Sequence, residues 1–564
     1  MSGDFGSSLD VSIYIFGPHW NVRFAWIVGH GGFHNAKAGL ILLCLHNRLT
    51  HYLRAELGLA EQDRKYTYRR KYYGEQRQTK RNQKDTQTHQ SGEEEKETGK
   101  EGEIARMLQC LKKSAACIAF LSFISVSASQ KPNILFIMAD DLGWMDLACQ
   151  GNKLVETPHL DRLAKQGMRF TSAYAAAPVC SPTRCAVLTG QAPARIGLTT
   201  HLPGMYSPKD NRPQPAILTK QLGTEYVTIA ERLREAGYAN AFLGKWHIAS
   251  SVGKGGRVAP ELSPTGQGFD INIGGTSYGG PPSFFSPYRN GELKDGPEGE
   301  YLPDRLVDET INFIGKNKSK SWMTHLWFYT VHWPMQAPEP LLKKYANRKG
   351  PGLNDTRYGA MIEAMDLAIG RLLKALDDMG QSDNTLVIFT SDNGGFAGVS
   401  DCRPLRESKG HLYEGGIRVP MIVRWPGEVK PGTLCDAPVI SMDFYPTFLE
   451  LAGLKSGKQP IDGESLVQLF KQGGELKRKA IYFHYPNYAW HMGNRLGSVI
   501  REGDWKLIRN YDDNSLELYN LSKDLSEKRN VAQQQPKLAA RLNLQLGKWL
   551  KETNAPMPRP PSIK

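Results

Sequence analysis

The amino-acid sequence predicts an α/β protein: a large mixed, mostly parallel sheet sandwiched by helices, followed by a smaller C-terminal subdomain of antiparallel strands and a helix. From residue 132 onward, short apolar runs alternate with helical patterns, as in proteins whose parallel strands are joined through helices. Near the C-terminus, short strand patterns separated by turns replace this alternation, and a helical pattern covers residues 535–552. We therefore expect a main domain at 131–460 and a subdomain at 461–564.

The composition is that of an ordinary globular protein. The chain has 564 residues, of which 40% are hydrophobic and 23% charged. Its formal net charge of +14 favours anionic ligands, although a solvated basic surface accounts for most of these charges. No zinc-finger spacing or clustered basic helix is present, so nucleic acid is not an expected partner.

The sequence of the first 128 residues does not predict a part of the folded domain. Residues 61–106 have almost no apolar periodicity, which predicts a disordered or non-native extension at 1–106. Residues 107–128 have the parts of a secretory signal peptide. These parts are Met107, the basic Lys112 and Lys113, an apolar run, and the small residues Val126 and Ala128. We expect Met107 to be the initiator and the protein to be exported, either periplasmic or secreted.

The apolar run of residues 107–128 is short for a membrane span, and no stable membrane anchor is expected.

Cleavage near Ala128 would leave an odd number of cysteines. The five remaining cysteines are Cys149, Cys180, Cys185, Cys402 and Cys435. In an oxidising compartment an odd count leaves one thiol unpaired.

Four apolar runs are each followed by polar side chains that could form a site. In chain order, "NILFIMADD" ends in Asp140 and Asp141, "YANAFLGKWH" in Lys245 and His247, "SWMTHLWFYTVHWP" reaches His332, and "NTLVIFTSDNGG" reaches Asp392 and Asn393. Helical patterns at 157–167 and 358–380, each closed by glycine, separate such runs. Because ligands of open α/β sheets bind beyond the carboxyl ends of the strands, these side chains predict one shared site.

Four of these side chains offer only oxygen atoms as ligands. They are Asp140, Asp141, Asp392 and Asn393, and hard oxygen donors suit Ca²⁺ or Mg²⁺. Adjacent carboxylates repel each other unless a cation lies between them. The alternative is structural, because "ADDLG" and "SDNGG" are also good turn or helix-cap sequences.

The segment "CSPTR" at 180–184 is open to four interpretations: half of a disulfide, a metal ligand, a cysteine nucleophile, or a side chain that is chemically converted. Ser181 can cap a helix that begins at Pro182 and stops at Gly190. Cys180 would then lie at a helix N-terminus, where amides favour an anion, with Arg184 in the first turn. A thiolate nucleophile is conceivable there, but it would face carboxylates and an anionic substrate.

Together these motifs resemble those of type I, formylglycine-dependent sulfatases, the arylsulfatase A-like group of the alkaline phosphatase-like superfamily. The resemblance extends from Lys131 to the C-terminus. It rests on six motifs that follow one another along the chain in the order of the family. They are "ADDLG", "CSPTR" with the following "LTG", "GKWH", "VHWP", "SDNGG" and "SKGHLYEGGIRVP". One departure is His159, which stands where the family usually has asparagine and lies outside the predicted chemistry.

The resemblance implies a cofactor and a set of site residues. Cys180 would be oxidised by a dedicated maturation enzyme to formylglycine, an aldehyde that is hydrated in water. The implied metal site binds Ca²⁺, with Mg²⁺ as an alternative, through Asp140, Asp141, Cys180, Asp392 and Asn393. The implied catalytic residues are Cys180, Arg184, Lys245, His247, His332 and Lys409.

The resemblance also implies a mechanism. One hydroxyl of the hydrated aldehyde attacks sulfur and displaces the alcohol, while the cation polarises it. Arg184, Lys245 and Lys409 balance the charge on the sulfuryl oxygens. His332, with Lys409, assists the leaving oxygen, and His247 takes the proton of the second hydroxyl so that sulfate departs.

Two segments are expected to border the substrate. A C-terminal set of aromatic and basic residues is predicted to line the pocket and stack on a sugar, although aromatic residues in strands usually just pack. This set is His484, Tyr485, Trp490, His491 and Arg495. The glycine- and proline-rich residues 277–304 predict a long surface loop near the mouth of the site.

The predicted function is hydrolysis of a sulfate ester, on a sulfated carbohydrate or an aryl sulfate. The first alternative is a phosphodiesterase or phosphonate hydrolase on the same scaffold. The second is a non-catalytic glycan-binding relative. A third, in which Cys180 is half of a structural disulfide, would remove the mechanism.

Overall fold

The computed structural model describes residues 131–204 and 207–561. Two expectations, the extension at 1–106 and the signal peptide at 107–128, lie outside these described residues. In the part of the chain that is described, we find no helix that is both long enough and apolar enough to span a bilayer.

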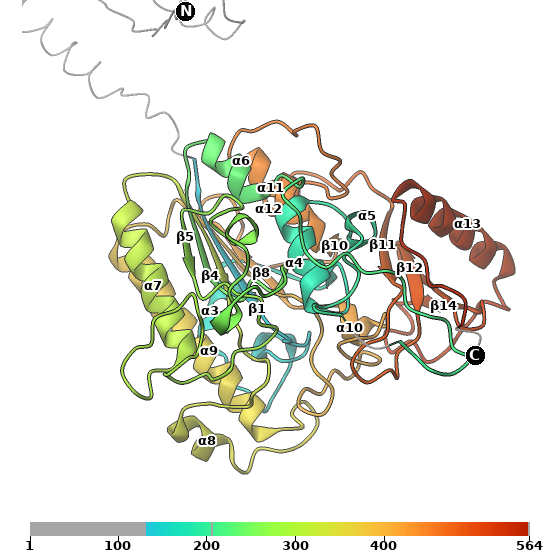
Figure 1. Cartoon of the computed structure of the whole chain (residues 1–564), viewed down its shortest axis with the longest axis horizontal. Coiled ribbons are helices and arrows are strands. Elements are labelled where there is room, and N and C mark those ends of the chain that lie inside the picture. The colour runs from blue at the N-terminus through green and yellow to red at the C-terminus, as the bar shows by residue number, and fades with distance from the viewer. Residues whose placement is uncertain (1–130, 205–206, 562–564) are drawn as a thin grey trace, which may run out of the picture. The chain divides into compact units, whose positions relative to one another are not determined.

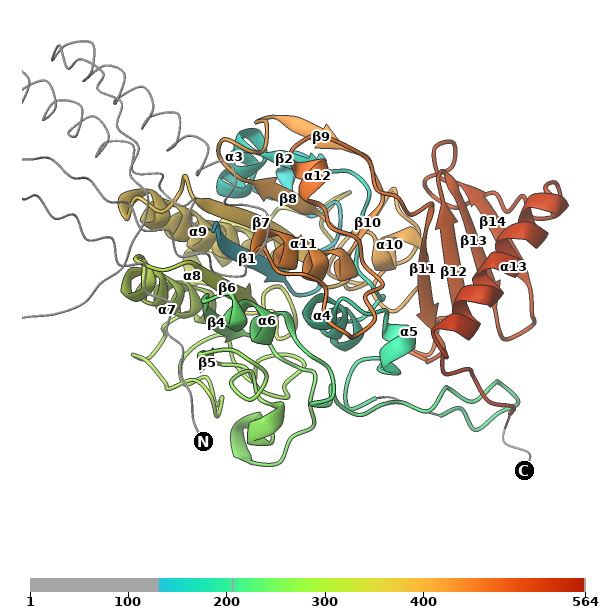
Figure 2. The same ribbon diagram turned by 90° about the horizontal axis from the view of Figure 1, so that it is seen from above.

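The main sheet has eight strands in the order β5-β4-β6-β1-β7-β8-β2-β9. Figure 1 shows the whole chain, and Figure 2, turned by 90°, labels every strand of this sheet. They are β1 (Asn133–Ala139), β2 (Met168–Phe170), β4 (Ala239–Gly244), β5 (Ile271–Ile273), β6 (Trp322–Trp327), β7 (Thr385–Ser391), β8 (Met421–Arg424) and β9 (Thr433–Cys435). The five strands from β5 to β7 in this order are parallel. β8 is antiparallel to both neighbours, and β9 pairs parallel with β2. The predicted mixed, mostly parallel sheet is confirmed.

Strand β1 lies at the centre of the sheet, and all seven of its residues are buried. Ile137 is in register with Leu326 of β6 and with Phe389 of β7. A central parallel strand has helices on both faces, which explains why its sequence is a continuous apolar run.

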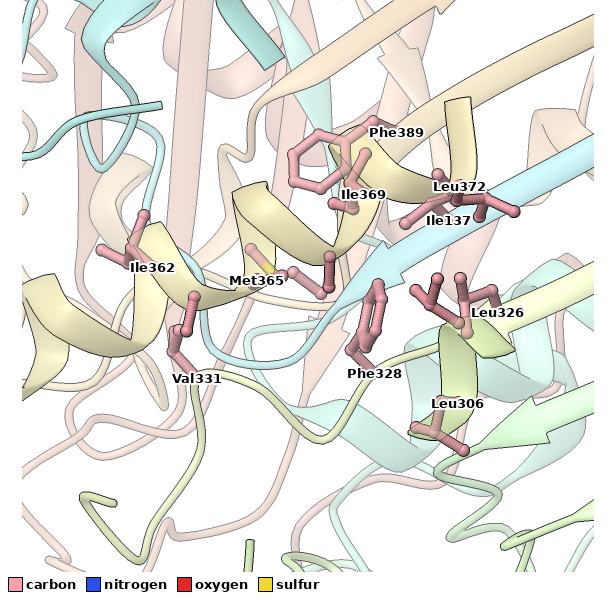
Figure 3. Packing of buried hydrophobic residues seen from close by; sticks show 14 of the residues in the cluster. Ile137, Leu306, Leu326, Phe328, Val331, Ile362, Met365, Ile369, Leu372 and Phe389 are labelled. Carbon is pink, nitrogen blue, oxygen red and sulfur yellow. The ribbon is translucent and has the colours of Figure 1, made fainter. Parts of the chain in front are cut away.

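Helices cover both faces of this sheet. The helices that precede the C-terminal sheet in the chain are α3 (Pro158–Gln166), α4 (Cys180–Thr189), α5 (Pro193–Ile196), α6 (Ile229–Glu235), α7 (Leu302–Asn317), α8 (Glu339–Tyr345), α9 (Thr356–Asp378), α10 (Glu414–Ile417), α11 (Phe444–Leu451) and α12 (Val467–Phe470). The face that carries Ile137 packs against α7 and α9, where Met365, Ile369 and Leu372 point toward β1 and β7 (Figure 3). The face that carries Phe136 packs against α6 and α11.

Short elements complete the main domain. β3 (Ala173–Tyr174) and β10 (Val439–Ile440) form a two-stranded parallel sheet, and the 3₁₀ helices are η1 (Ala148–Gln150), η2 (Lys254–Gly256), η3 (Pro260–Leu262) and η4 (Ser441–Asp443).

The C-terminal part forms a separate four-stranded antiparallel sheet, as predicted. Its strands are β11 (Ala480–Tyr485), β12 (Gly497–Glu502), β13 (Trp505–Asn510) and β14 (Leu516–Asn520), in that order. Helix α13 (Pro536–Glu552) lies across one face of this sheet (Figure 2). Leu542, Leu546 and Leu550 of α13 pack there against Ile500 and Leu507.

A buried ionic cluster joins this small sheet to the main domain. Lys506 of β13 contacts Glu414 at 2.9 Å and Glu527 at 2.7 Å, and all three side chains are essentially unexposed. Glu414 also pairs with Arg418 at 3.3 Å and accepts a hydrogen bond from the Tyr174 hydroxyl at 2.6 Å. Because each charge in this cluster has a partner of opposite sign, the cluster is compatible with burial.

Three local expectations need correction. Helix α4 begins at Cys180, and Ser181 does not cap it: the Ser181 hydroxyl donates to the His247 carbonyl at 2.7 Å and accepts from the Leu202 amide at 3.1 Å. Strand β6 ends at Trp327, so His332 lies on the following loop. Residues 277–301 form no regular helix or strand, as expected, but they are not merely a surface loop, because their aromatic side chains enter the core: Phe284, Tyr288 and Tyr301 are buried there.

His325 of β6 is a titratable group in an apolar core. Its ring lies 5.5 Å from Phe136, 5.1 Å from Phe269 and 5.1 Å from Trp327 between centroids. Neither ring nitrogen has a hydrogen-bond partner within the described residues. Burial lowers the pKa of His325 from 6.5 to about 3.

This burial makes His325 a source of acid instability. In the unfolded chain His325 is protonated below pH 6.5, whereas in the folded chain it stays neutral down to about pH 3. The free energy of unfolding therefore falls as the pH drops through that window. His325→Leu should therefore reduce the loss of unfolding free energy between pH 8 and pH 5 by about 2 kcal/mol. Urea denaturation at the two pH values measures this, and an unchanged difference would contradict it.

Candidate active site

The carboxyl ends of β1, β4 and β7 deliver the predicted polar residues to one place. Asp140 and Asp141 follow β1, Lys245 follows β4, and Asp392 and Asn393 follow β7; each of these side chains is buried. The parallel pairing of β7 with β1 also sets the Asp141 amide 3.2 Å from Asp392 Oδ1, to which it donates. The sheet itself therefore assembles half of the predicted site.

Helix α4 adds Cys180 and Arg184. The Arg184 guanidinium is fully buried and donates to Asp392 Oδ2 from Nε at 3.0 Å and from Nη2 at 2.6 Å. Its Nη1 donates to the Lys245 carbonyl at 2.6 Å. Arg184 is thus fixed by β4 and β7 together, with its charge at the centre of the site.

Two lysines neutralise the two aspartates that follow β1. Lys245 Nζ donates to both carboxylate oxygens of Asp140, at 2.9 and 2.7 Å. Lys409 Nζ lies 2.6 Å from Asp141 Oδ1 and 2.7 Å from Oδ2. The Asn393 amide donates to Asp141 Oδ1 at 2.8 Å.

The three carboxylates differ in their ionisation. Burial raises the pKa of Asp140 well above its ordinary value; Lys245 opposes this rise, and the neighbouring Asp392 adds to it. Burial also acts to raise the pKa of Asp141, but Lys409, with help from His332, outweighs burial and lowers it. At Asp392 burial is outweighed in the same way by Arg184, so its pKa is lowered. The mutual repulsion of these buried acids is the kind of stress that a bound cation relieves.

The donor atoms for such a cation lie close together. One oxygen each of Asp140 and Asp392 and the Cys180 Sγ are within 4.8 Å of one another. The buried Asn393 Oδ1 has no hydrogen-bond partner within the described residues. Asp141 lies beside this group but directs its carboxylate to Lys409 and Asn393.

Two histidines border the buried thiol and Asp141. His247 Nδ1 lies 3.4 Å from Cys180 Sγ, while its Nε2 lies 2.8 Å from the Leu202 carbonyl. His332 Nε2 lies 3.7 Å from Asp141 Oδ2. Burial is the largest cause that lowers both pKa values, that of His332 to about 3, and nearby lysines add to it. Both rings are therefore neutral near pH 7.

The backbone is strained at two of these positions. Asp141 has φ of 63° and His247 has φ of 53°, the left-handed region that residues with a Cβ rarely adopt. Such strain persists where surrounding contacts hold it, and here it aims the Asp141 carboxylate and the His247 ring into the site.

Two glycines of the 277–304 segment pack directly on the histidine rings. A Cβ on Gly279 would lie 2.9 Å from His247 Cε1, and one on Gly280 would lie 2.5 Å from His332 Nδ1. The expectation that this segment borders the site is therefore met at these two residues.

Gly280→Ala should displace the His332 ring. The new methyl group would also lie 2.7 Å from the Trp333 carbonyl, so neither neighbour can move away easily. The resemblance assigns His332 to the leaving oxygen, and small displacements of reacting groups are costly, so we expect kcat on a sulfate ester to fall by about tenfold or more. Gly473→Ala is the matched control because its Cβ would meet nothing within 4 Å. Equal activity of the two variants would contradict the prediction.

The C-terminal residues predicted to line the pocket divide into two groups. Lys409 Nζ lies 5.2 Å from the Trp490 ring centroid, and His491 stacks on His411 at 4.9 Å, so this turn reaches the site. His484, in contrast, is buried between Ser498 and the Pro556 carbonyl, and Arg495 pairs with acidic residues of its own subdomain. His484 therefore packs within its own subdomain, and Arg495 forms ion pairs there.

Sequence reasoning missed His201. Its ring lies 6.0 Å from that of Trp490, and burial together with the nearby His247 lowers its pKa to about 3. It lies in the loop after α5, where no periodicity or motif marked it. Tyr485, which was predicted, lies next to this loop, with its hydroxyl 3.3 Å from that of Thr200.

All ten predicted metal and catalytic residues lie within this one network of contacts. Two family models match the chain: "Sulfatase" over residues 132–454 and "N-sulphoglucosamine sulphohydrolase, C-terminal" over residues 408–555. The chain belongs to the sulfatase family.

Individual relatives agree with this assignment. A protein described as "Sulfatase" from Formosa agariphila is 34% identical over 508 residues, covering 76% of this chain and 90% of the relative. Steryl-sulfatase of Mus musculus is 32% identical over 461 residues, covering 65% of this chain and 70% of that one. The crystal structure of Ps i-CgsB aligns with a TM-score of 0.65 and 32% identity, over 77% of this sulfatase and 94% of that chain. A structure of Ps i-CgsB with k-i-k-neocarrahexaose aligns with a TM-score of 0.64 and 31% identity, over the same shares.

Proposed function

We propose that this sulfatase hydrolyses the sulfate ester of a carbohydrate to an alcohol and inorganic sulfate, using a formylglycine made from Cys180. The observation that carries the proposal is the environment of that single thiol. Cys180 is 2% exposed and lies beside Asp140, Asp392 and the His247 ring, with Arg184 one helical turn further along α4. Its thiol is unpaired among the residues that the structure describes, so the structure offers no support for a disulfide at this position.

The proposed metal is Ca²⁺, with Mg²⁺ as the alternative. The residues fit a hard cation: the carboxylates are buried close together, and the Asn393 carbonyl oxygen lacks a partner. Asp140, Asp141, Asp392, Asn393 and residue 180 would hold it. When bound, such a cation supplies positive charge that polarises oxygen atoms of the nucleophile and of the sulfuryl group.

The Cys180 sulfur stands where the oxygens of the mature side chain would lie. A hydrated formylglycine supplies two hydroxyls, one for attack on sulfur and one whose proton is removed to release sulfate. This conversion requires a maturation enzyme as a partner of the newly made chain.

The geometry of His247 suits the removal of that proton. Its Nε2 faces the Leu202 carbonyl at 2.8 Å and must carry the hydrogen that this contact requires. Nδ1 then presents a lone pair toward residue 180, 3.4 Å from the sulfur. Burial keeps the ring neutral, as a general base must be before it acts.

Three fixed cations are proposed to hold the sulfuryl oxygens. Arg184, Lys245 and Lys409 are each at most 5% exposed and are anchored by an aspartate. Their preorganised charge stabilises the anionic transition state without reorganisation. His332 and Lys409 both contact Asp141 and are proposed to meet the leaving oxygen.

A sulfated carbohydrate is the favoured substrate class over a simple aryl sulfate. The similar Ps i-CgsB structure was determined with k-i-k-neocarrahexaose. Beyond residue 128 this chain keeps a net charge of +9, from 53 Lys and Arg against 44 Asp and Glu, which suits an anionic polymer. We also propose export, directed by the segment 107–128, and a division into a catalytic domain at 131–460 and a subdomain at 461–564. Helix α12 of the second segment packs on the main sheet through Leu469 and Phe470.

The test combines mass spectrometry with turnover. Protein made together with a formylglycine-generating enzyme should show a mass loss at residue 180, trapped by a hydrazide reagent, while Cys185 stays a thiol. The same sample should release sulfate from a sulfated oligosaccharide, with k-i-k-neocarrahexaose as the first probe, faster than phosphate from a matched phosphate ester. An intact thiol, or faster phosphate release, would overturn the proposal.

A further inference from the structure

Lys409 is held from two directions by different parts of the chain. Its ammonium lies within 2.7 Å of both Asp141 oxygens, and its backbone amide donates to the Gly395 carbonyl at 2.9 Å. The ammonium also lies over the indole ring of Trp490, 5.2 Å from its centroid. Asp141 follows strand β1 of the main sheet, whereas Trp490 belongs to the turn between β11 and β12.

That turn is built to keep the indole in place. The Ala489 amide donates to Asn494 Oδ1 at 2.7 Å, and Asn494 Nδ2 donates to the Asn487 carbonyl at 3.0 Å. The Trp490 ring stacks on Phe396 at 5.4 Å with 20° between planes. An aromatic ring fixed in this way offers a directed contact to a cation.

A second contact ties the same turn to the Lys409 segment. Gly410 has φ of 90°, and a Cβ there would lie 2.9 Å from the Cβ of Ala489 and 2.9 Å from His491 Nε2. The Gly410 amide donates to the Pro178 carbonyl at 2.8 Å, two residues before Cys180. The turn that carries Trp490 therefore packs against the Lys409 segment, which is itself hydrogen-bonded to the segment just before Cys180.

We infer that Trp490 is a positioning residue that holds the Lys409 ammonium for the reaction, an inference that rests on the proposed function. When a cation shares the charge of Asp141, the aspartate holds Lys409 less firmly. The indole face is uncharged and keeps its attraction for the ammonium. The subdomain would thus contribute to catalysis through a side chain that need not touch the substrate.

A small substrate separates this role from sugar binding. On 4-nitrophenyl sulfate, which has no sugar, Trp490→Leu should lower kcat by about tenfold to thirtyfold. Trp490→Phe keeps an aromatic face and should recover most of that loss. If Trp490 only stacked on a sugar, 4-nitrophenyl sulfate would be hydrolysed normally and only KM for a glycan would rise.

A double-mutant cycle tests whether Trp490 acts through Lys409. In a Lys409→Met background, Trp490→Leu should cause little further loss, because the group it positions is gone. Equal losses in both backgrounds would overturn the inference. Trp425→Phe is the matched control: its ring lies 5.5 Å from Lys471, another lysine–indole pair, and its activity should be unchanged.

A measurement without turnover keeps this inference separate from the proposed function. Acetylation of Lys409, followed by mass spectrometry of its peptide in the metal-loaded protein, should be faster in Trp490→Leu than in wild type or Trp490→Phe. Absence of sulfate-ester turnover by mature wild-type protein would count against the proposed function alone. Unchanged Lys409 labelling in Trp490→Leu, with the fold intact by circular dichroism, would overturn the positioning role.

Discussion

Replacing Cys180 with alanine is expected to lower sulfate-ester turnover by at least about 10⁴-fold, the scale on which enzymes lose activity with a covalent nucleophile. The physical reason is that alanine cannot be converted to an aldehyde, and no neighbouring group supplies a substitute. Cys180→Ser should be equally inactive unless it is itself converted, since serine has one hydroxyl and lacks the second that releases sulfate. Steady-state assays on 4-nitrophenyl sulfate and on a sulfated oligosaccharide measure both.

The same helix offers a matched control. Cys185 is also buried on α4, and burial raises the pKa of its thiol without any charged partner. Cys185→Ala should cost about 1 kcal/mol of stability because it removes one buried sulfur, as Cys180→Ala does in protein made without the maturation enzyme. It should nevertheless keep near wild-type turnover. Substantial activity in Cys180→Ala, or loss of activity in Cys185→Ala with the fold intact, would contradict the assignment.

The main sheet and the residues at its strand ends could be predicted because they depend on local patterns. The apolar run of β1 marks a buried central strand, and parallel strands must bring their carboxyl ends together. That rule alone places Asp140 near Asp392. The motif resemblance then added Lys409, whose position in a loop no periodicity could have indicated.

Other features depend on contacts between distant segments and could not be read from the sequence. Ser181 is a good helix-capping residue, yet the loop at Leu202 and the strained backbone at His247 take its hydroxyl. Gly280 looked like one of many loop glycines, although its close approach to His332 leaves no room for a side chain. Trp490 reaches Lys409 only because the small sheet packs against the main domain.

The Lys506 cluster also depends on contacts between distant segments. Of the substitutions predicted here, the loss of Lys506 should lower the free energy of unfolding most. Lys506→Met should lower the free energy of unfolding by about 3–5 kcal/mol, because it leaves two buried carboxylates without their shared partner. Lys548→Met is the control: that lysine is 77% exposed and, within the described residues, pairs only with Glu552, so about 0.5 kcal/mol or less should be lost. Urea denaturation of both variants provides the comparison.

A second substitution at Glu527 should recover part of the unfolding free energy that Lys506→Met loses. Its contact with Lys506 is short but does not have hydrogen-bond geometry, and burial raises its pKa from 4.5 to about 7. Burial acts in the same direction at Glu414, but Lys506 and the nearby Arg418 outweigh it and lower the pKa to about 2. Glu527→Gln should therefore restore a large part of the stability of Lys506→Met, whereas Glu414→Gln should not.

The pH dependence gives an independent check of this cluster. Because the folded chain holds the Glu527 proton up to about pH 7 and the unfolded chain releases it near pH 4.5, the contribution of Glu527 to stability is lost as the pH rises through that window. Glu527→Gln cannot lose this proton, so it should be more stable than wild type at pH 8 by a margin that shrinks toward pH 5. The opposite trend would mean that Glu527 is ionised throughout, and that Lys506 holds it as firmly as it holds Glu414.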